Sequence, residues 1–158
     1  TEQFVDPWPR PVVGAGFAVV GTASAAAAVA ESNVIFAFRA YSEQVEDLIT
    51  GKEVISMELG QELERAAAAV DSAYKGNSVA VVSSGDAGIY GMSGPVFRVL
   101  TDRDWDGQSP AVMTVPGVSA MQAAAAVIGS PLMQDFCAIS LKFCFMYLGY
   151  RGCCNWFT

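Results

Sequence analysis

The chain of 158 residues contains 9 Lys and Arg, 16 Asp and Glu and no His, so its formal charge is −7. Its length predicts one domain with a sizeable core, because a chain of roughly 150 residues buries about 70% of its unfolded surface. Without histidine, Ser-His-Asp and Cys-His nucleophile systems and His-ligated metal sites are excluded, and we predict no bound metal. The acidic composition argues against nucleic acid as a partner.

The sequence also lacks the patterns of membrane insertion and secretion. The nearest candidate for a membrane span, residues 136–148, is shorter than the roughly 20 apolar residues required, and it contains Lys142. No signal-peptide pattern opens the chain. All four cysteines lie after residue 136 without a CxxC pair, which favours free thiols. We therefore expect a soluble, cytoplasmic protein with no membrane partner.

Short apolar runs alternate with longer alanine-rich segments after a proline-rich leader or linker at residues 1–11. In chain order the pattern predicts strand 12–13, helix 22–32, strand 34–38, helix 42–50, strand 53–57, helix 61–75, strand 79–82, helix 93–100, strand 111–115, helix 119–128 and strand 136–141. This alternation predicts an α/β domain with a mainly parallel sheet flanked by helices on both faces. Because small side chains allow close packing, we expect the four-alanine runs at 25–28, 66–69 and 123–126 to lie against the sheet.

The helix over 61–75 has the clearest apolar stripe. Residues predicted to face the core are Leu63, Ala66, Ala67, Val70 and Tyr74. Residues predicted to face water are Glu62, Glu64, Arg65 and Asp71.

Two loops at the carboxyl ends of predicted strands are candidate ligand sites, because open parallel sheets bind ligands there. The first, residues 83–94, contains four glycines that let a ligand approach the backbone closely. In this loop Asp86 can accept hydrogen bonds from a hydroxyl or ammonium group of a ligand, or can cap the next helix. The second loop, residues 115–120, has a Pro-Gly turn followed by Ser119 as a predicted N-cap.

A third glycine pair, Gly14 and Gly16, follows the first predicted strand. It is not a dinucleotide fingerprint, because Val19 stands where GxGxxG requires Gly or Ala. It also lacks the GK[ST] ending of a phosphate-binding loop.

The runs VAVVSSGDAGIYGMSGPVF (79–97) and VPGVSAMQAAAAVIGSPLMQDFCAISL (115–141) resemble the tetrapyrrole methylase superfamily, and within it the precorrin-3B C(17)-methyltransferase family of cobalamin biosynthesis. The segment FRAYSEQVEDLITGKEVISMELGQELERA (38–66) is similar to the same family. The resemblance covers roughly residues 34–141, and SSGDAGIYGM is a specific signature. It identifies residues 12–141 as the N-terminal α/β domain of such an enzyme.

The resemblance implies an S-adenosylmethionine-dependent enzyme that methylates precorrin-3B at ring carbon 17, with ring contraction. Such enzymes have a second α/β domain, hold the cofactor between the two domains, and are homodimers when full length. The family's cofactor contacts fall on Gly85, Asp86, Ala87, Ile89, Tyr90, Ser119 and Ala120. Arg39 and Tyr41 lie where the family can meet a carboxylate of its anionic tetrapyrrole substrate, and no catalytic residue is assigned.

The sequence departs from the family in three places. Phe17 replaces the proline of the first glycine loop, and Gln134 replaces a histidine in the PLMxDF motif. The match stops at Leu141, so we expect an atypical tail over 142–158, for which an out-of-frame end is one explanation, and an absent second domain. Two alternatives therefore stay open: another precorrin methyltransferase, and a non-catalytic α/β interaction or dimerisation module.

Overall fold

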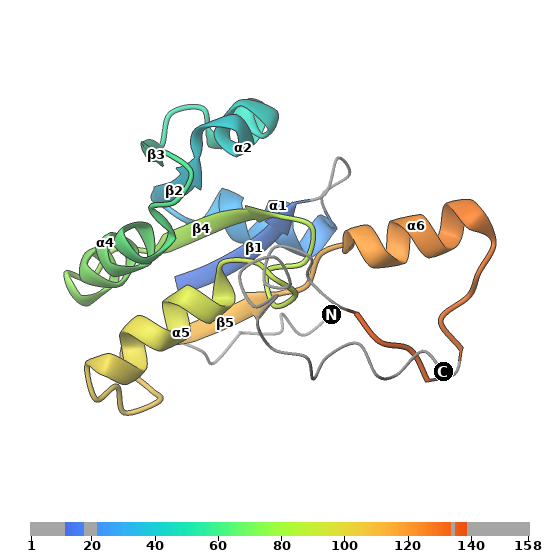
Figure 1. Ribbon diagram of the computed structural model, residues 1–158. Helices are drawn as coiled ribbons and strands as arrows, with labels where there is room; N and C mark the ends of the chain where they lie inside the picture. Colours follow the sequence, from blue (N-terminus) through green and yellow to red (C-terminus); the bar gives the residue numbers. More distant parts are fainter. Residues whose placement is uncertain (1–11, 18–21, 134, 139–158) are drawn as a thin grey trace, which may run out of the picture.

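The protein folds as an α/β sandwich in a computed structural model that describes residues 12–17, 22–133 and 135–138 (Figure 1). The described strands are β1 (Val12–Phe17), β2 (Val34–Phe38), β3 (Glu53–Met57), β4 (Val79–Ser84) and β5 (Val112–Val115). They form one sheet in the order β3-β2-β4-β1-β5, and every neighbouring pair is parallel. The predicted fold class is therefore confirmed.

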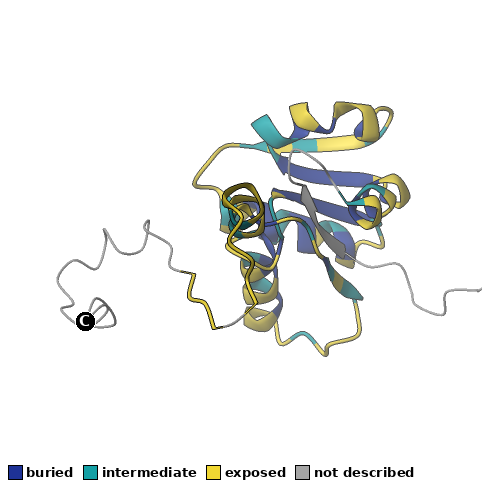
Figure 2. Ribbon diagram, turned by 90° about the vertical axis from the view of Figure 1, so that its right-hand side faces the viewer, coloured by how far each residue is buried: buried dark blue, intermediate teal, exposed yellow. Residues whose placement is uncertain are grey.

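Helices cover both faces of this sheet, as right-handed crossovers require. The described helices are α1 (Ala23–Glu31), α2 (Arg39–Gln44), α3 (Glu46–Ile49), α4 (Glu62–Tyr74), α5 (Ser93–Asp102) and α6 (Ala120–Ile128), of which α6 alone buries no residue against the sheet. Alternate residues of β2 and β4 point to opposite faces, so both strands are buried almost throughout (Figure 2). Ile35 and Val82 pack with α1 and α3, whereas Phe36 and Val81 pack with α4 and α5. None of the described helices is long and apolar enough to cross a membrane.

The structure corrects two element boundaries. The helix predicted over 42–50 begins at Arg39 and is interrupted at Val45, whose backbone (φ −120°, ψ 20°) separates α2 from α3. Residues 136–138 of the predicted last strand are not in a strand, and residues 139–141 lie outside the described residues. The stretch 42–50 is polar with few apolar residues, so its helix boundaries are poorly determined by sequence. Residues 136–141 (FCAISL) are apolar, but an apolar run forms a strand only where a neighbouring strand is available to pair with it.

The buried stripe of α4 is rotated relative to the prediction. Arg65, expected to face water, is buried with 3% of its surface exposed, whereas Leu63 is 46% exposed. The buried residues are Arg65, Ala66, Ala69, Val70 and Ala73. Ala66 and Val70 are therefore buried as predicted, whereas the prediction is wrong for Leu63 and Tyr74, which are about half exposed. Because alanines occupy four consecutive positions, two overlapping stripes with helical spacing fit the sequence.

The three alanine runs do not share one environment. Ala25 and Ala28 of α1, and Ala66 and Ala69 of α4, are buried against the sheet as predicted. The third run lies in α6, which has no buried residue and projects beyond the sheet rather than lying on a face (Figure 1). The prediction for residues 123–126 is therefore wrong.

Candidate functional site

The two loops singled out in the sequence lie together at the carboxyl edge of the sheet. The glycine-rich loop (residues 85–92) follows β4, and the Pro-Gly loop (residues 116–119) follows β5. Their strands are not neighbours, because β1 lies between them. A Cβ placed on Gly85 would still lie 3.8 Å from the Cα of Ser119, so the two loops are in contact.

Asp86 connects these loops. Its Oδ1 accepts a hydrogen bond from the Gly88 N–H at 2.8 Å, and its Oδ2 accepts one from the Gly117 N–H at 3.0 Å. The helix-cap alternative for Asp86 is wrong, because α5 has Met92 as its N-cap residue and no side-chain capping bond. Two loop amides thus share one carboxylate.

The glycine-rich loop is folded tightly on itself. The Ile89 N–H donates to the Asp86 carbonyl, and the Ser93 N–H donates to the Ala87 carbonyl, at 3.2 and 3.0 Å. A Cβ at Gly91 would lie only 2.7 Å from the carbonyl oxygens of Asp86 and Ala87, so this position has no room for a side chain. The loop therefore depends on glycine at position 91.

The tip of this loop presents side chains to solvent. Ala87 is fully buried below it, whereas Ile89 is 40% and Tyr90 67% exposed. Tyr90 has φ +55°, a conformation that is uncommon for a residue with a side chain. Its hydroxyl donates to the carbonyl of Ala138 at 3.2 Å.

Ser119 begins α6 with a complete capping box. Its hydroxyl accepts from the Gln122 N–H at 3.2 Å, and the Gln122 side chain accepts from the Ser119 N–H at 2.9 Å. The predicted N-cap is confirmed. Ala120 is the first residue of this helix and comes directly after the Pro-Gly loop.

The two residues assigned to substrate binding reach different neighbours. The Ser84 hydroxyl, at the end of β4, donates to the Tyr41 hydroxyl oxygen at 2.9 Å, so Tyr41 lies beside the start of the glycine-rich loop. Its ring also packs edge-on against Phe38, with centroids 5.2 Å apart. Arg39 instead pairs with Glu58 at 3.6 Å, and both side chains are about two-thirds exposed.

Arg65 is a buried charged group that the sequence placed on the water-facing side of its helix. Its two terminal nitrogens donate to the Glu58 carbonyl and to the Met92 sulfur, both at 3.4 Å, and its Nε has no hydrogen-bond partner among the residues that the structure describes. Burial lowers the pKa of Arg65, and the nearby Glu62 and Tyr41 oppose this effect. The burial of Arg65 could have been predicted, because Arg65, Ala66 and Ala69 have the spacing of one helix face.

Of the two substituted positions in the family pattern, the structure describes Phe17 but not Gln134. Phe17 is the last residue of β1, and its Cα pairs with that of Ser84, so the strand is continuous through the substituted position. Gln134 lies outside the described residues, as do residues 18–21.

The fold and the paired loops define an α/β domain of the corrin-methylase type, and comparison with known proteins identifies the family. Residues 12–143 match the family of Tetrapyrrole (Corrin/Porphyrin) Methylases. The chain belongs to this family.

Within this family, the chain is similar to methyltransferases that are named for cobalt-factor III or precorrin-3B. The chain is 41% identical over 122 residues to "Cobalt-factor III methyltransferase" of Priestia megaterium, and this match covers 77% of this chain and 23% of that protein. It is 38% identical over 130 residues to "Probable cobalt-factor III C(17)-methyltransferase" of Salmonella typhimurium, covering 82% and 53%. To "Precorrin-3B C(17)-methyltransferase" of Sinorhizobium sp it is 35% identical over 129 residues, covering 82% and 50%. The predicted likeness to C(17)-methyltransferases is confirmed.

A solved structure supports the same grouping. The methyltransferase CobJ superposes with a TM-score of 0.71 at 30% identity, covering 89% of this chain and 62% of that one. Cobalt precorrin-4 methyltransferase CbiF, at 20% identity and a TM-score of 0.61, shares the fold. The chain spans about half the length or less of the first curated relatives that it matches.

Proposed function

We propose that this chain forms the N-terminal part of an S-adenosylmethionine-dependent enzyme that methylates precorrin-3B, or its cobalt-containing counterpart, at ring carbon 17 with ring contraction, in cobalamin biosynthesis. The observation that supports this most is the contact between the glycine-rich and Pro-Gly loops, tied by the Asp86–Gly117 hydrogen bond. It occurs in a chain that is 35–41% identical to relatives named for that reaction.

The described residues fit such a cofactor at the joined loops. The tight packing at Gly91 holds the loop backbone against itself, and the exposed Ile89 and Tyr90 offer apolar surface for a heterocyclic base. The amides of the first turn of α6 can meet a carboxylate. The residues proposed to hold the cofactor are Gly85, Asp86, Ala87, Ile89, Tyr90, Ser119 and Ala120.

The chain's own contribution is positioning. When bound, S-adenosylmethionine supplies a methyl group on a positively charged sulfur, and transfer of this group depends on alignment more than on a strong base. A chain without histidine can therefore serve this chemistry. The loops would orient the cofactor and exclude water on one side, while Tyr41, held by Ser84, borders the adjoining part of the edge.

Substrate binding needs local positive charge, because the chain is acidic overall and the proposed substrate is anionic. Arg39 is exposed, and its one ion pair among the described residues is with the equally exposed Glu58. Exposed ion pairs contribute little, about 0–1 kcal/mol, so a substrate carboxylate can replace Glu58 at small cost. We propose that Arg39 exchanges partners in this way.

Two glycines provide a matched test of cofactor binding by calorimetric titration with S-adenosylmethionine. Gly91→Ala places a Cβ against two backbone oxygens, whereas Gly94→Ala, in the first turn of α5, meets no atom within 4 Å. We expect wild type and G94A to bind equally and G91A to lose binding. Absence of wild-type binding at millimolar cofactor would contradict the proposed function for this chain.

The reaction itself is tested with precorrin-3B and S-adenosylmethionine labelled with carbon-13 in the methyl group. NMR of the product should place the label on ring carbon 17. A label on another ring carbon would support the alternative of a different precorrin methyltransferase. Cofactor binding without turnover would restrict this chain to cofactor binding.

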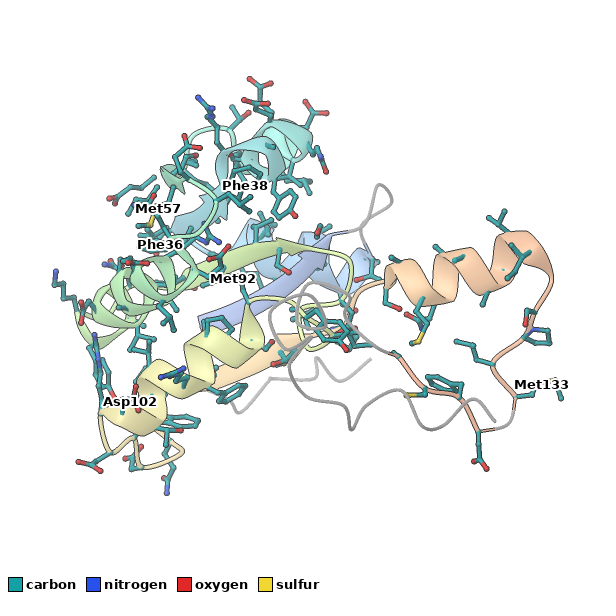
Figure 3. All side chains as sticks on the ribbon, viewed as in Figure 1. Phe36, Phe38, Met57, Met92, Asp102 and Met133 are labelled. Atoms are coloured by element: carbon teal, nitrogen blue, oxygen red, sulfur yellow. The ribbon has the colours of Figure 1, made fainter. Side chains whose placement is uncertain are left out.

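One observation favours the second candidate, an interaction or dimerisation module. The apolar residues of α6 and the segment after it face solvent, with Val127 87% and Met133 83% exposed, and Figure 3 shows Met133 far from the core residues Phe36 and Met92. Such surface is typical of contacts between proteins. Light scattering would test self-association: a dimer that Val127→Glu converts to monomer supports this candidate, and a wild-type monomer argues against it. The homodimer and the cytoplasmic location stay predictions.

A further inference from the structure

Asp86 has a role more specific than that of one cofactor contact among seven. We propose that Asp86 is a positioning residue: it fastens the glycine-rich loop to the Pro-Gly loop, so that both face one cofactor molecule. This inference rests on the proposed function and refines it. In this view Asp86 affects cofactor binding because it sets the distance between the two loops.

The topology explains why such a fastening is needed. The loops follow β4 and β5, which have no hydrogen bonds with each other because β1 separates them. The sheet therefore fixes where each loop begins without fixing the separation of their tips. The Asp86–Gly117 hydrogen bond spans this gap directly.

The chemistry of the contact is specific to aspartate. Each carboxylate oxygen accepts from one backbone N–H, Oδ1 from Gly88 and Oδ2 from Gly117. An ionised carboxylate only accepts hydrogen bonds, so it suits two donors at once, and such charge-assisted bonds are the stronger ones. Asparagine would turn an NH2 group toward one of the two donors. Gly88 contributes as well, because a Cβ there would lie 3.2 Å from Oδ1.

A second contact joins α5 to β5 and does not involve Asp86, so replacing Asp86 can change the position of the loops without unfolding the domain. The hydroxyls of Ser93, at the start of α5, and Thr114, in β5, are 3.0 Å apart. This contact holds α5 to β5 when Asp86 is replaced. We therefore expect Asp86 variants to fold and to lose only the alignment of the loop tips.

The test compares Asp86→Asn with Ser93→Ala in two measurements. Amide hydrogen exchange without cofactor should be faster at Gly117 in D86N than in wild type, and unchanged there in S93A. Calorimetric titration with S-adenosylmethionine should show binding weakened about 10-fold or more in D86N, consistent with the loss of a charged hydrogen bond, and nearly unchanged in S93A. Asp86→Ala should behave like D86N in both measurements.

The outcomes separate the two claims. If D86N weakens binding but leaves exchange at Gly117 unchanged, Asp86 acts on the cofactor directly and the inference is overturned. Unchanged cofactor binding in D86N overturns it too. If wild type binds no S-adenosylmethionine, the proposed function fails, and exchange at Gly117 still decides whether Asp86 fastens the loops. If D86N does not fold, the Ser93–Thr114 contact does not suffice and the positioning role is overturned.

Discussion

Helices α4 and α6 contain the same four-alanine run and have opposite environments. In α4 the run lies beside Val70, and both pack against β2, β4 and α5. In α6 the run follows β5, an edge strand, and the helix leaves the sheet without burying a residue. Alanine permits close packing but provides little apolar surface of its own, and both helices follow an edge strand and have a valine directly after the run. The two helices differ in what comes next: α4 leads back to β4 in the middle of the sheet and so crosses its face, whereas no described strand follows α6.

Helix α6 must therefore draw its stability from local interactions. Its capping box satisfies amides at the start, and Gly129 (φ +68°) ends it in the left-handed conformation that favours glycine. Alanine also has the highest intrinsic helix propensity. Helix α4, by contrast, has no side-chain capping bond and is held by packing.

Hydrogen exchange should reveal the largest difference between the two helices. Amides in the middle of α4 are expected to exchange only through opening close to global unfolding, which costs about 5–15 kcal/mol in typical domains. Amides of α6 should exchange orders of magnitude faster, through local fraying. Equal protection of both helices, measured by NMR on the same sample, would show that α6 is packed in solution.

Enlarging one alanine in each run should have unequal effects on stability. Ala69→Leu forces three extra carbons into a fully buried site and should lower the free energy of unfolding by about 1–3 kcal/mol. Ala124→Leu, on the exposed helix, should change it by less than about 0.5 kcal/mol. Urea denaturation measures both values, and similar losses would contradict the assignment of α6 as unpacked.

Removing the cap should be a smaller, local change. Ser119→Ala deletes the hydroxyl that accepts from Gln122, at a cost of about 1 kcal/mol to helix stability. Because α6 is not packed on the sheet, we expect faster exchange within α6 and little change in the urea midpoint. Thr22→Ala offers the matched control in α1: Thr22 caps a packed helix and also bonds the Pro116 carbonyl, so its loss should shift the midpoint. An equal shift in S119A would contradict this view.

The sequence predicted the sheet because its central strands are continuous apolar runs separated by helices of clear type. It also located both loops, since their glycines, proline and N-cap serine are local signals. It failed at Arg65 because an alanine run fits two helical stripes. It could not predict the Asp86–Gly117 contact, which joins residues 31 positions apart across an intervening strand. Nor could it show that Arg39 faces Glu58 while Tyr41 meets Ser84.

The central claim is that two loops from non-adjacent strands form one cofactor site. Hydrogen exchange monitored by mass spectrometry, with and without saturating S-adenosylmethionine, tests it most directly. We predict slower exchange on cofactor addition in both the glycine-rich loop (85–92) and the Pro-Gly loop with the first turn of α6 (116–122), and no change in α3. Protection of only one loop, or of neither, would contradict the claim.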